Sequence, residues 1–188
     1  MDLTTSRLIL RPWRDADLGA FARLNDDPAV MEFLPRRLSR DESDATAARI
    51  RATIETRGWG FWAVEVKGAG PAAEAFIGFV GLSVPSFEAH FTPCVEIGWR
   101  LAKEYWGCGY ASEAAAASLR FAFDQLRLQQ IVAFTVPLNS RSRRVMERIG
   151  MSRDVAGDFE HPKLPPGHPL RPHVLYRVSR TEWLNRKA

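Results

Sequence analysis

The amino-terminal part of the chain carries the pattern of one strand followed by two helices. Residues 7–13 alternate well enough for a strand, and Pro12 places that strand at an edge or close to its end. Asp15 can cap a helix that runs to about residue 25 and carries an apolar stripe. Residues 39–42, Ser-Arg-Asp-Glu, form a capping-box pattern, which predicts a second helix that ends before Gly58.

The middle of the chain has the pattern of three strands. Residues 61–67 and 75–84 predict two strands, and the glycine- and proline-containing segment 68–71 between them predicts a hairpin turn. Residues 94–101 predict a third strand. The first part of the sheet is therefore expected to be antiparallel.

Helices and strands alternate in the second half of the chain. Residues 110–126 form the clearest helix, because they are rich in alanine and place larger apolar side chains along one side. A strand is predicted over 130–136, and a short helix over 139–149 is ended by Gly150. The pattern from residue 155 is weak, and a proline-rich loop at 162–172 leads to a last strand at 173–178.

The predicted order of elements is β-α-α-β-β-β-α-β-α-β-β. The strand–helix–strand unit in its middle implies a right-handed crossover and locally parallel strands. We therefore predict an α/β (α+β) fold with a mixed sheet of six or seven strands and flanking helices. The length of 188 residues fits a single domain over residues 1–188.

The composition is that of an ordinary globular protein, with 46% apolar and 26% charged residues. Cys94 and Cys108 are too few for a disulfide framework and fit a reducing compartment. The chain start lacks the basic and apolar regions of a signal peptide, and the longest apolar run, residues 76–84, is too short to span a bilayer. We expect a cytoplasmic protein that has no membrane partner.

The net charge of +4 suits a phosphate-rich ligand. It would also suit nucleic acid, but no stretch interleaves basic and aromatic residues as single-strand binders do. A mildly basic solvated surface explains the charge by itself, so the charge does not choose among these ligands.

The most specific chemistry lies in the turn between the strand at 94–101 and the helix at 110–126. Gly107 and Gly109 occur there, separated by one residue. A helix N-terminus has about four unpaired N–H groups and a partial positive charge. Glycines allow an anion to approach the backbone closely because they lack a Cβ. A strand, a glycine turn and a helix in this order form a candidate diphosphate cradle.

Two other diphosphate motifs do not fit this turn. No Gly-Lys-Ser or Gly-Lys-Thr follows it, which argues against a P-loop. Ser112 stands where a dinucleotide fingerprint has its third glycine. Because a plain strand-to-helix connection can also contain two glycines, the interpretation of this turn as a diphosphate site needs further evidence from elsewhere in the chain.

That support is a resemblance to a known family. Residues 104–114, Glu-Tyr-Trp-Gly-Cys-Gly-Tyr-Ala-Ser-Glu-Ala, resemble the acetyl-CoA signature of the GNAT superfamily of N-acetyltransferases. The nearest branch is the RimJ/RimL-like one, which contains ribosomal-protein N-terminal acetyltransferases, and residues 5–11 resemble its first strand. A second segment of that branch is matched at the same spacing by Asn139, Ser142, Val145, Met146, Glu147, Gly150 and Met151. The resemblance covers nearly the whole chain.

The resemblance implies the GNAT fold and direct transfer of acetyl from acetyl-CoA to a primary amine, without an acyl-enzyme. It implies that backbone N–H groups around residues 106–111 hold the CoA diphosphate. It also implies that the pantetheine arm enters between two splayed strands and bonds the backbone of residues 98–101, where one N–H is the oxyanion donor. The implied CoA-binding residues of these two segments are Gly98, Trp99, Arg100, Leu101, Trp106, Gly107, Cys108, Gly109, Tyr110 and Ala111.

Two residues of the signature raise questions of their own. Glu104 stands where the superfamily often has Gln or Arg, and it would repel a diphosphate that it faced. We expect its side chain to point to solvent. Cys108 would be a nucleophile in a different mechanism, activated by the helix N-terminus. We expect its thiol to point away from the ligand.

Glu96 is the first candidate for the general base. It lies in an otherwise apolar strand, and burial raises the pKa of a carboxylate toward a useful value. A solvent-facing side chain or a structural ion pair would explain this residue equally well, and the base could also act through water. His90, in the loop before the strand, is the second candidate because imidazole titrates near neutrality. Its alternative is a surface histidine.

The helix at 139–149 carries the remaining candidates. Asn139 could bond the pantetheine amide, cap the helix, or do both. The resemblance places Ser142 near the CoA sulfur, where its hydroxyl would donate to the thiolate; this helix contains no tyrosine for that task. Arg144 represents the basic residues that could reach the 3′-phosphate of CoA. The basic cluster consists of Arg141, Arg143, Arg144 and Arg148.

Three histidines occur in or beside the proline-rich loop, at positions 161, 168 and 173. No cysteine and no helical histidine pair accompany them, so no metal site is predicted. We expect a stiff loop at the mouth of the acceptor site instead.

Three functions are compatible with these patterns. The first is an acetyl-CoA-dependent N-acetyltransferase for a primary amine, on a protein N-terminus or a small molecule. The second is a non-catalytic CoA-binding regulatory domain, and the third is a nucleic-acid-associated protein. We favour the first because the two binding motifs and the candidate base occur together. Residues 15–57 are expected to wall the acceptor site, in a monomer or homodimer.

Overall fold

The computed structural model describes residues 1–68 and 76–186, and the chain packs as two compact units. Unit 1 consists of Met1–Leu82 and Gly98–Ser118, and unit 2 consists of Ser83–Ile97 and Leu119–Ala188. Strand β5 (Glu96–Leu101) begins in unit 2 and continues in unit 1 from Gly98.

Unit 1 contains the antiparallel part of the sheet. Its strands are β1 (Leu3–Thr4), β2 (Leu8–Arg11), β3 (Phe61–Val66) and most of β4 (Phe76–Ser83). β2 pairs with both β1 and β3, and β3 pairs with β4, each time antiparallel. The hairpin predicted from the two apolar segments is confirmed. The predicted turn at 68–71 lies, from residue 69 on, outside the described residues.

The second helix of unit 1, α2 (Arg40–Arg57), has the ends that its sequence predicts. The Ser39 hydroxyl accepts from the Glu42 N–H, and the Glu42 carboxylate accepts from the Ser39 N–H at 2.9 Å. Gly58 ends the helix in the left-handed region with φ +76°. The capping box and its stop signal are confirmed because both depend on local backbone geometry.

The predicted cap of the first helix, α1 (Asp17–Asp26), is wrong. Ala16 occupies the N-cap position, and no side chain caps it. Asp15 instead binds Arg51 at 2.7 Å, while the Asp17 carboxylate accepts from the Arg14 N–H at 2.7 Å. Arg11 holds Asp17 at this place with two bonds of 2.8 Å, and this buried pairing determines where the helix begins.

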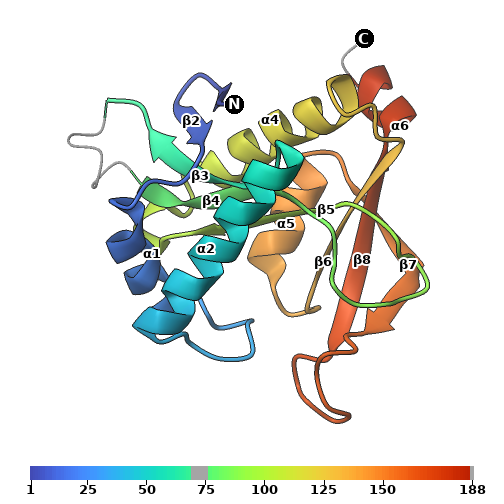
Figure 1. Cartoon of the computed structure of the whole chain (residues 1–188). Coiled ribbons are helices and arrows are strands. Elements are labelled where there is room, and N and C mark those ends of the chain that lie inside the picture. The colour runs from blue at the N-terminus through green and yellow to red at the C-terminus, as the bar shows by residue number, and fades with distance from the viewer. Residues whose placement is uncertain (69–75, 187–188) are drawn as a thin grey trace. The chain divides into compact units, whose positions relative to one another are not determined.

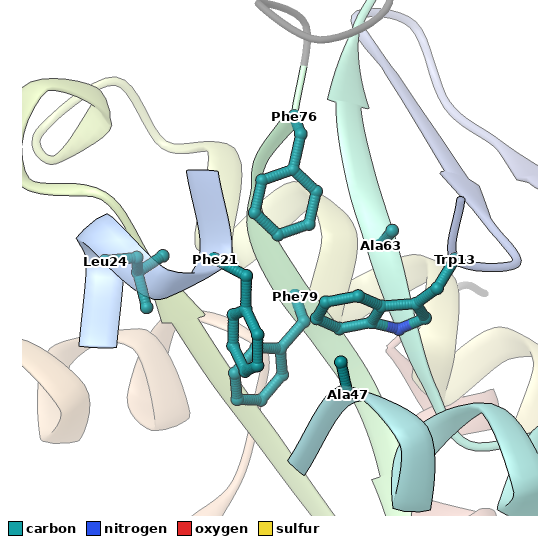
Figure 2. Packing of buried hydrophobic residues seen from close by; sticks show 7 residues of the cluster. All are labelled: Trp13, Phe21, Leu24, Ala47, Ala63, Phe76 and Phe79. Atoms are coloured by element: carbon teal, nitrogen blue, oxygen red, sulfur yellow. The ribbon is translucent and has the colours of Figure 1, made fainter. Parts of the chain in front are cut away.

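An aromatic cluster lies between the two helices and strands β3 and β4 (Figure 2). The Trp13 and Phe21 rings meet edge to face at a centroid distance of 4.8 Å, and the Phe21 and Phe79 rings at 5.9 Å. The Trp13 Nε1–H donates to the Phe61 carbonyl at 2.8 Å, so its polar edge is satisfied. The buried members of the cluster are Trp13, Phe21, Leu24, Ala47, Ala63, Phe76 and Phe79.

Unit 2 contains the start of β5 and the strands that follow it in the chain (Figure 1). β5 pairs in parallel with β6 (Gln130–Thr135) at Glu96 and Val132, and β6 pairs antiparallel with β8 (Pro172–Ser179). β7 (Ser152–Glu160) pairs antiparallel with β8 and forms the edge. The helices of this unit are α5 (Ser140–Arg148), α6 (Arg180–Asn185) and the end of α4 (Tyr110–Asp124) from Leu119 on.

The strands follow the order β1-β2-β3-β4-β5-β6-β8-β7 in one mixed sheet. The predicted α/β class and the parallel pair around α4 are confirmed. The sheet has eight strands rather than six or seven, because two-residue β1 is too short to show a period. None of the helices in the described part of the chain is long and apolar enough to cross a membrane.

Candidate active site

The turn between β5 and α4 has the backbone that two glycines allow. A 3₁₀ turn, η1 (Lys103–Tyr105), follows β5, and Gly107 and Gly109 then have φ values of +77° and +81°. The Glu113 N–H donates to the Gly109 carbonyl at 3.0 Å, which closes the first turn of α4. The N–H groups of residues 109–112 consequently have no intrahelical acceptor. They and the helix dipole are suited to an anion.

The segment that precedes β2 holds this turn in place. Arg7 Nη1 donates to the Cys108 carbonyl at 3.0 Å, and Arg7 Nε donates to the Glu113 carboxylate at 2.7 Å. The Thr5 hydroxyl donates to the same carboxylate at 2.6 Å. The Arg7 guanidinium also lies 4.7 Å from the centre of the Tyr110 ring. One arginine therefore contacts the turn, its flanking ring and the first turn of α4.

Glu113 would oppose anion binding if its charge were not compensated. Burial favours a higher pKa for this carboxylate, but hydrogen bonds from Thr5, Arg7 and Ser6 together lower its pKa to about 2. The carboxylate is thus ionised at neutral pH and paired with Arg7. Sequence reasoning did not find this contact. Its one signal was the likeness of residues 5–11 to the family's first strand.

The other side chains of the turn occupy varied positions. Trp106 anchors the turn to β5, because its Nε1–H donates to the Leu101 carbonyl at 2.8 Å. Glu104 is exposed, as expected. Cys108 is an exposed free thiol, with its Sγ 3.6 Å from the Trp106 carbonyl oxygen.

A cavity of about 380 Å³ lies in unit 1 beside η1. Its volume is in the range of small-molecule pockets. Its wall combines apolar side chains with one cation, two carboxylates and a phenol, so no single charge is preferred. The lining residues are Ala20, Arg23, Leu24, Asp27, Val30, Phe76, Ile77, Ala102, Glu104 and Tyr105.

The part of β5 in unit 1 contains the residues predicted to bond the pantetheine arm. A Cβ added to Gly98 would come within 3.1 Å of the Phe61 ring, so the strand lies close to this ring. Trp99 is half-buried and Leu101 is buried. The Arg100 side chain reaches Asn25 of α1, where Nη1 donates to Oδ1 at 2.6 Å.

Glu96 lies in unit 2 and has the environment expected for a general base. Burial raises the pKa of its carboxyl group to about 7, against the opposing effects of a hydrogen bond from Ser83 and the charge of Lys163. The residue retains partial exposure, so the carboxylate is desolvated yet reachable. It is not fully solvent-facing, and it forms no ion pair with the residues that the structure describes; these were the two structural roles that its sequence position left open. Ser83 and Lys163 had no sequence signal, because both are distant in the chain.

His90 occupies a different environment in the same unit. It is exposed, and its ring contacts Phe91 at a centroid distance of 5.3 Å. It is also one of the groups that lower the pKa of Asp154. These neighbours are those of a surface histidine. Its role as an alternative base stays a prediction.

Asn139 and Ser142 are hydrogen-bonded to each other at the N-terminus of α5. Asn139 is the N-cap, and its Oδ1 accepts from the Ser142 N–H at 3.1 Å. Its Nδ2 donates to the Thr135 hydroxyl at 3.2 Å. The capping role of Asn139 is therefore confirmed, while contact of either residue with CoA stays a prediction. Within the described residues, no hydrogen bond engages the Ser142 hydroxyl itself.

The basic residues of α5 differ in how far they are engaged. Arg143 donates to the Tyr176 hydroxyl at 3.3 Å and to the Pro137 carbonyl at 3.2 Å. The Tyr176 hydroxyl in turn donates to Glu147 at 3.0 Å. Arg143 and Glu147 thus have structural partners, whereas Arg144 is exposed. Tyr176 reaches this helix from β8, which sequence spacing did not indicate.

The loop histidines pack against phenylalanine rings. The His161 and His173 rings lie 5.0 Å apart, and both contact Phe159. Burial, the nearby His173 and Lys163 lower the pKa of His161 to about 4, and burial also lowers the pKa of His173. Both rings are neutral near pH 7. Within residues 1–68 and 76–186, no group of three or more His, Cys, Asp or Glu could hold a metal ion.

Comparison with known proteins places this geometry in a family. The family model of the acetyltransferase (GNAT) domain matches residues 7–152. This range includes the glycine turn, Arg7 that holds it, and the N-terminus of α5. The chain belongs to the GNAT acetyltransferase family. GNAT enzymes use acetyl-CoA as a co-substrate and act on amines, and this chain is accordingly an acetyl-CoA-dependent N-acetyltransferase.

Individual proteins agree with this assignment over nearly the full chain. FsC-acetyl coenzyme A-N(2)-transacetylase of Aspergillus fumigatus is 31% identical over 97% of this chain and 77% of its own length. The uncharacterized N-acetyltransferase YnaD of Bacillus subtilis is 31% identical over 97% of this chain and 99% of its own length. A GNAT-family acetyltransferase from Bacillus anthracis is 26% identical, with a TM-score of 0.77 over 96% of this chain and 99% of that protein.

Proposed function

We propose that this enzyme transfers acetyl directly from the CoA thioester to a primary amine, with residues 1–188 as one catalytic domain of the RimJ/RimL-like branch. The main support for this proposal is the turn of Gly107 and Gly109 at the start of α4, which Arg7 holds in place. Its free N–H groups suit the CoA diphosphate. Exposed Arg144 takes the 3′-phosphate, and the backbone of residues 98–101 takes the pantetheine arm.

The acceptor must lose a proton before it can react, because an ammonium has no lone pair. Glu96 takes that proton, directly or through one water molecule. Its pKa of about 7 supports this role, since a base works best when its pKa is close to the working pH. His90 is the alternative base and requires the same test.

The free amine then attacks the carbonyl carbon of the thioester. A C–N bond forms, and the carbonyl electrons move to oxygen, which accepts a hydrogen bond from a backbone N–H of residues 98–101. Collapse of this intermediate breaks the C–S bond. The Ser142 hydroxyl gives its proton to the sulfur, and the second proton of the nitrogen passes to the Ser142 oxygen, which restores the hydroxyl. The products are the amide, CoA thiol and the proton held by Glu96.

Asn139 supports this step by holding the residue that donates. It accepts from the Ser142 N–H and so fixes the first turn of α5. One Nδ2 hydrogen donates to Thr135, which leaves the second for the pantetheine chain. The capping and ligand roles of Asn139 are compatible.

A thiol-release assay tests the proposal. The full chain is mixed with acetyl-CoA and, in turn, a peptide with a free N-terminus, a polyamine, an aminoglycoside and an amino acid. Released thiol is followed with a chromogenic disulfide, and products are identified by the added mass of one acetyl group. Because the exposed Cys108 thiol also reacts with such a reagent, enzyme without amine is the blank.

The expected result is thiol release that depends on one amine class and falls sharply in Glu96→Gln. Glu88→Gln is the matched control, because Glu88 is an exposed glutamate from the same unit. Tight CoA binding without thiol release for any amine would contradict the proposal. That outcome would favour a regulatory CoA-binding domain.

A further inference from the structure

The Arg100 side chain is a desolvated cation that has no acidic partner among the described residues. Burial is the cause that lowers its pKa to about 10, and no charged group acts against it. Within residues 1–68 and 76–186, its one hydrogen-bond partner is Asn25, which is neutral. A charge that is removed from water is unfavourable unless something compensates for it. The folded chain does not supply that compensation from its described residues.

Neutral groups hold this guanidinium in a fixed place. Arg100 Nη1 donates to Asn25 Oδ1 at 2.6 Å, and Asn25 Nδ2 donates to the Ser43 hydroxyl at 2.9 Å. Asn25 and Ser43 are both fully buried. The guanidinium also lies 5.3 Å from the centre of the Phe79 ring. Helices α1 and α2 and strand β4 therefore fix the cation without neutralising it.

One edge of the guanidinium is uncommitted. The bond to Asn25 uses Nη1, and no hydrogen bond to the described residues uses Nε or Nη2. The buried polar atoms that lack any partner include Nε and Nη2 of Arg51, but no atom of Arg100. Solvent therefore still reaches the Nε and Nη2 edge of Arg100. This edge presents two parallel N–H groups, the arrangement that binds the two oxygens of a carboxylate.

We infer that Arg100 binds a carboxylate of the acetyl acceptor, so that the acceptor is an amine that also carries a carboxylate. Amino acids and short peptides belong to this class, whereas polyamines and aminoglycosides would bring further positive charge toward an uncompensated cation. The inference rests on the proposed function. The side chain projects from β5 toward α1 and Phe79, beside the cluster of Figure 2, where the acceptor wall is expected.

A phosphate group of CoA is the other source of the same oxyanion chemistry. The experiment separates the two by using acceptors that share one amine. The dipeptide alanyl-phenylalanine is compared with its C-terminal amide, and phenylalanine is compared with phenylalaninamide. We expect kcat/KM to be about tenfold or more higher for each acid than for its amide, as for a charge-assisted bidentate contact. The KM for acetyl-CoA should be the same whether the acceptor is the acid or its amide.

Substitutions then assign this preference to Arg100. Arg100→Gln should make acid and amide equal, and Arg100→Lys should keep part of the preference because it retains the charge without the fork. Arg37→Gln is the control, since Arg37 is an exposed arginine of the same unit. An unchanged acid-to-amide ratio together with a raised KM for acetyl-CoA would overturn the inference and assign the guanidinium to CoA.

Two further measurements test the inference even if the Arg100 variants do not fold. Asn25→Asp supplies an internal carboxylate to Arg100, and it should raise the melting temperature and lower the acid-to-amide ratio. In the unmodified chain, phenylglyoxal should label Arg100, as located by peptide mass spectrometry. N-acetyl-alanyl-phenylalanine should protect Arg100, and its amide should not.

These measurements distinguish failure of the proposed function from failure of the carboxylate site. If no amine releases thiol, the proposed function fails, while selective protection of Arg100 by the acid would still establish the anion site. If thiol is released but acid and amide react equally and protect equally, the proposed function stands and the carboxylate site is overturned. An Arg100 that phenylglyoxal does not label would also overturn it, because its free edge would be closed.

Discussion

Arg7 donates to the carbonyl oxygen of Cys108 at 3.0 Å, although the two residues are 101 positions apart in the chain. The same side chain pairs with Glu113 in the first turn of α4. A single arginine thereby holds the turn and neutralises a carboxylate in the first turn of α4. Binding of an anion at the turn should depend on this residue, even though the proposed contacts to the anion come from the backbone.

Arg7→Gln is expected to raise the KM for acetyl-CoA by about tenfold, because charge-assisted bonds to the turn and to Glu113 are lost. The kcat should change little, since Arg7 does not touch the reacting atoms. Arg7→Lys should recover part of the loss. Steady-state kinetics with acetyl-CoA varied would measure this, and Arg37→Gln is again the control. A fall in kcat at unchanged KM would contradict the positioning role.

The activity should depend on pH through Glu96. Because the base works when it is deprotonated, kcat/KM should rise with pH through about 7 and then level off. Glu96→Gln should lower kcat by about 100-fold or more and remove this rising limb. A limb that persists in Glu96→Gln and vanishes in His90→Gln would assign the base to His90 instead.

The same carboxyl group should affect stability in the opposite direction. Burial raises its pKa from 4.5 toward about 7, so the folded state favours the protonated form. Its stabilising contribution is present at low pH and is lost as the pH rises from about 4.5 to about 7. Glu96→Gln should therefore melt at a higher temperature than the unmodified chain above pH 7, and the difference should disappear near pH 4. Equal melting temperatures at both pH values would contradict the burial of this charge.

Ser142→Ala should lower kcat by less than about tenfold, because a thiolate is a good leaving group and needs less help than the usual effect of an acid catalyst. The KM for acetyl-CoA should stay the same. Ser140→Ala is the matched control, since Ser140 is an exposed serine of the same helix. Identical kinetics for the two variants would remove Ser142 from the mechanism.

Cys108→Ala should retain full activity. The thiol is exposed and lies beside the turn, but direct transfer does not use it. N-ethylmaleimide should label Cys108 before Cys94, because burial and the charge of Glu96 raise the pKa of Cys94 to about 11. Intact mass spectrometry after mixing with acetyl-CoA should find no acetylated enzyme. An acetyl group on Cys108 and loss of activity in the variant would point to a covalent mechanism.

Asp17→Asn should destabilise the chain by about 3 kcal/mol or more, because it replaces one of the two carboxylates on buried Arg11 with a neutral group. Arg11 is 2% exposed and Asp17 is 0% exposed, and two bonds of 2.8 Å join them. Urea unfolding would measure the free energy of unfolding. Asp15→Asn should change it by less than about 0.5 kcal/mol, since Asp15 is exposed. Equal effects would show that the second carboxylate on Arg11, from Glu65, is sufficient by itself.

The sequence by itself determined the features that depend on a few neighbouring residues. The capping box at Ser39 and Glu42, the stop at Gly58 and the positive φ values at Gly107 and Gly109 were all predictable, because backbone sterics and local hydrogen bonds decide them. A second capping box, at Ser179 and Glu182, begins α6 and could have been found in the same way. Asp15 was a misleading local signal, because the neighbouring buried pair of Arg11 and Asp17 outweighed it.

The tertiary structure decided everything that depends on partners distant in the chain. Only folding brings Arg7 to Glu113, Ser83 and Lys163 to Glu96, and Asn25 to Arg100. Desolvation depends on the complete surroundings of a group, so no local pattern could give the raised pKa of Glu96 or the uncompensated charge of Arg100. The sequence located the glycine turn and the candidate base, and packing then determined the charge and the accessibility of these candidate groups.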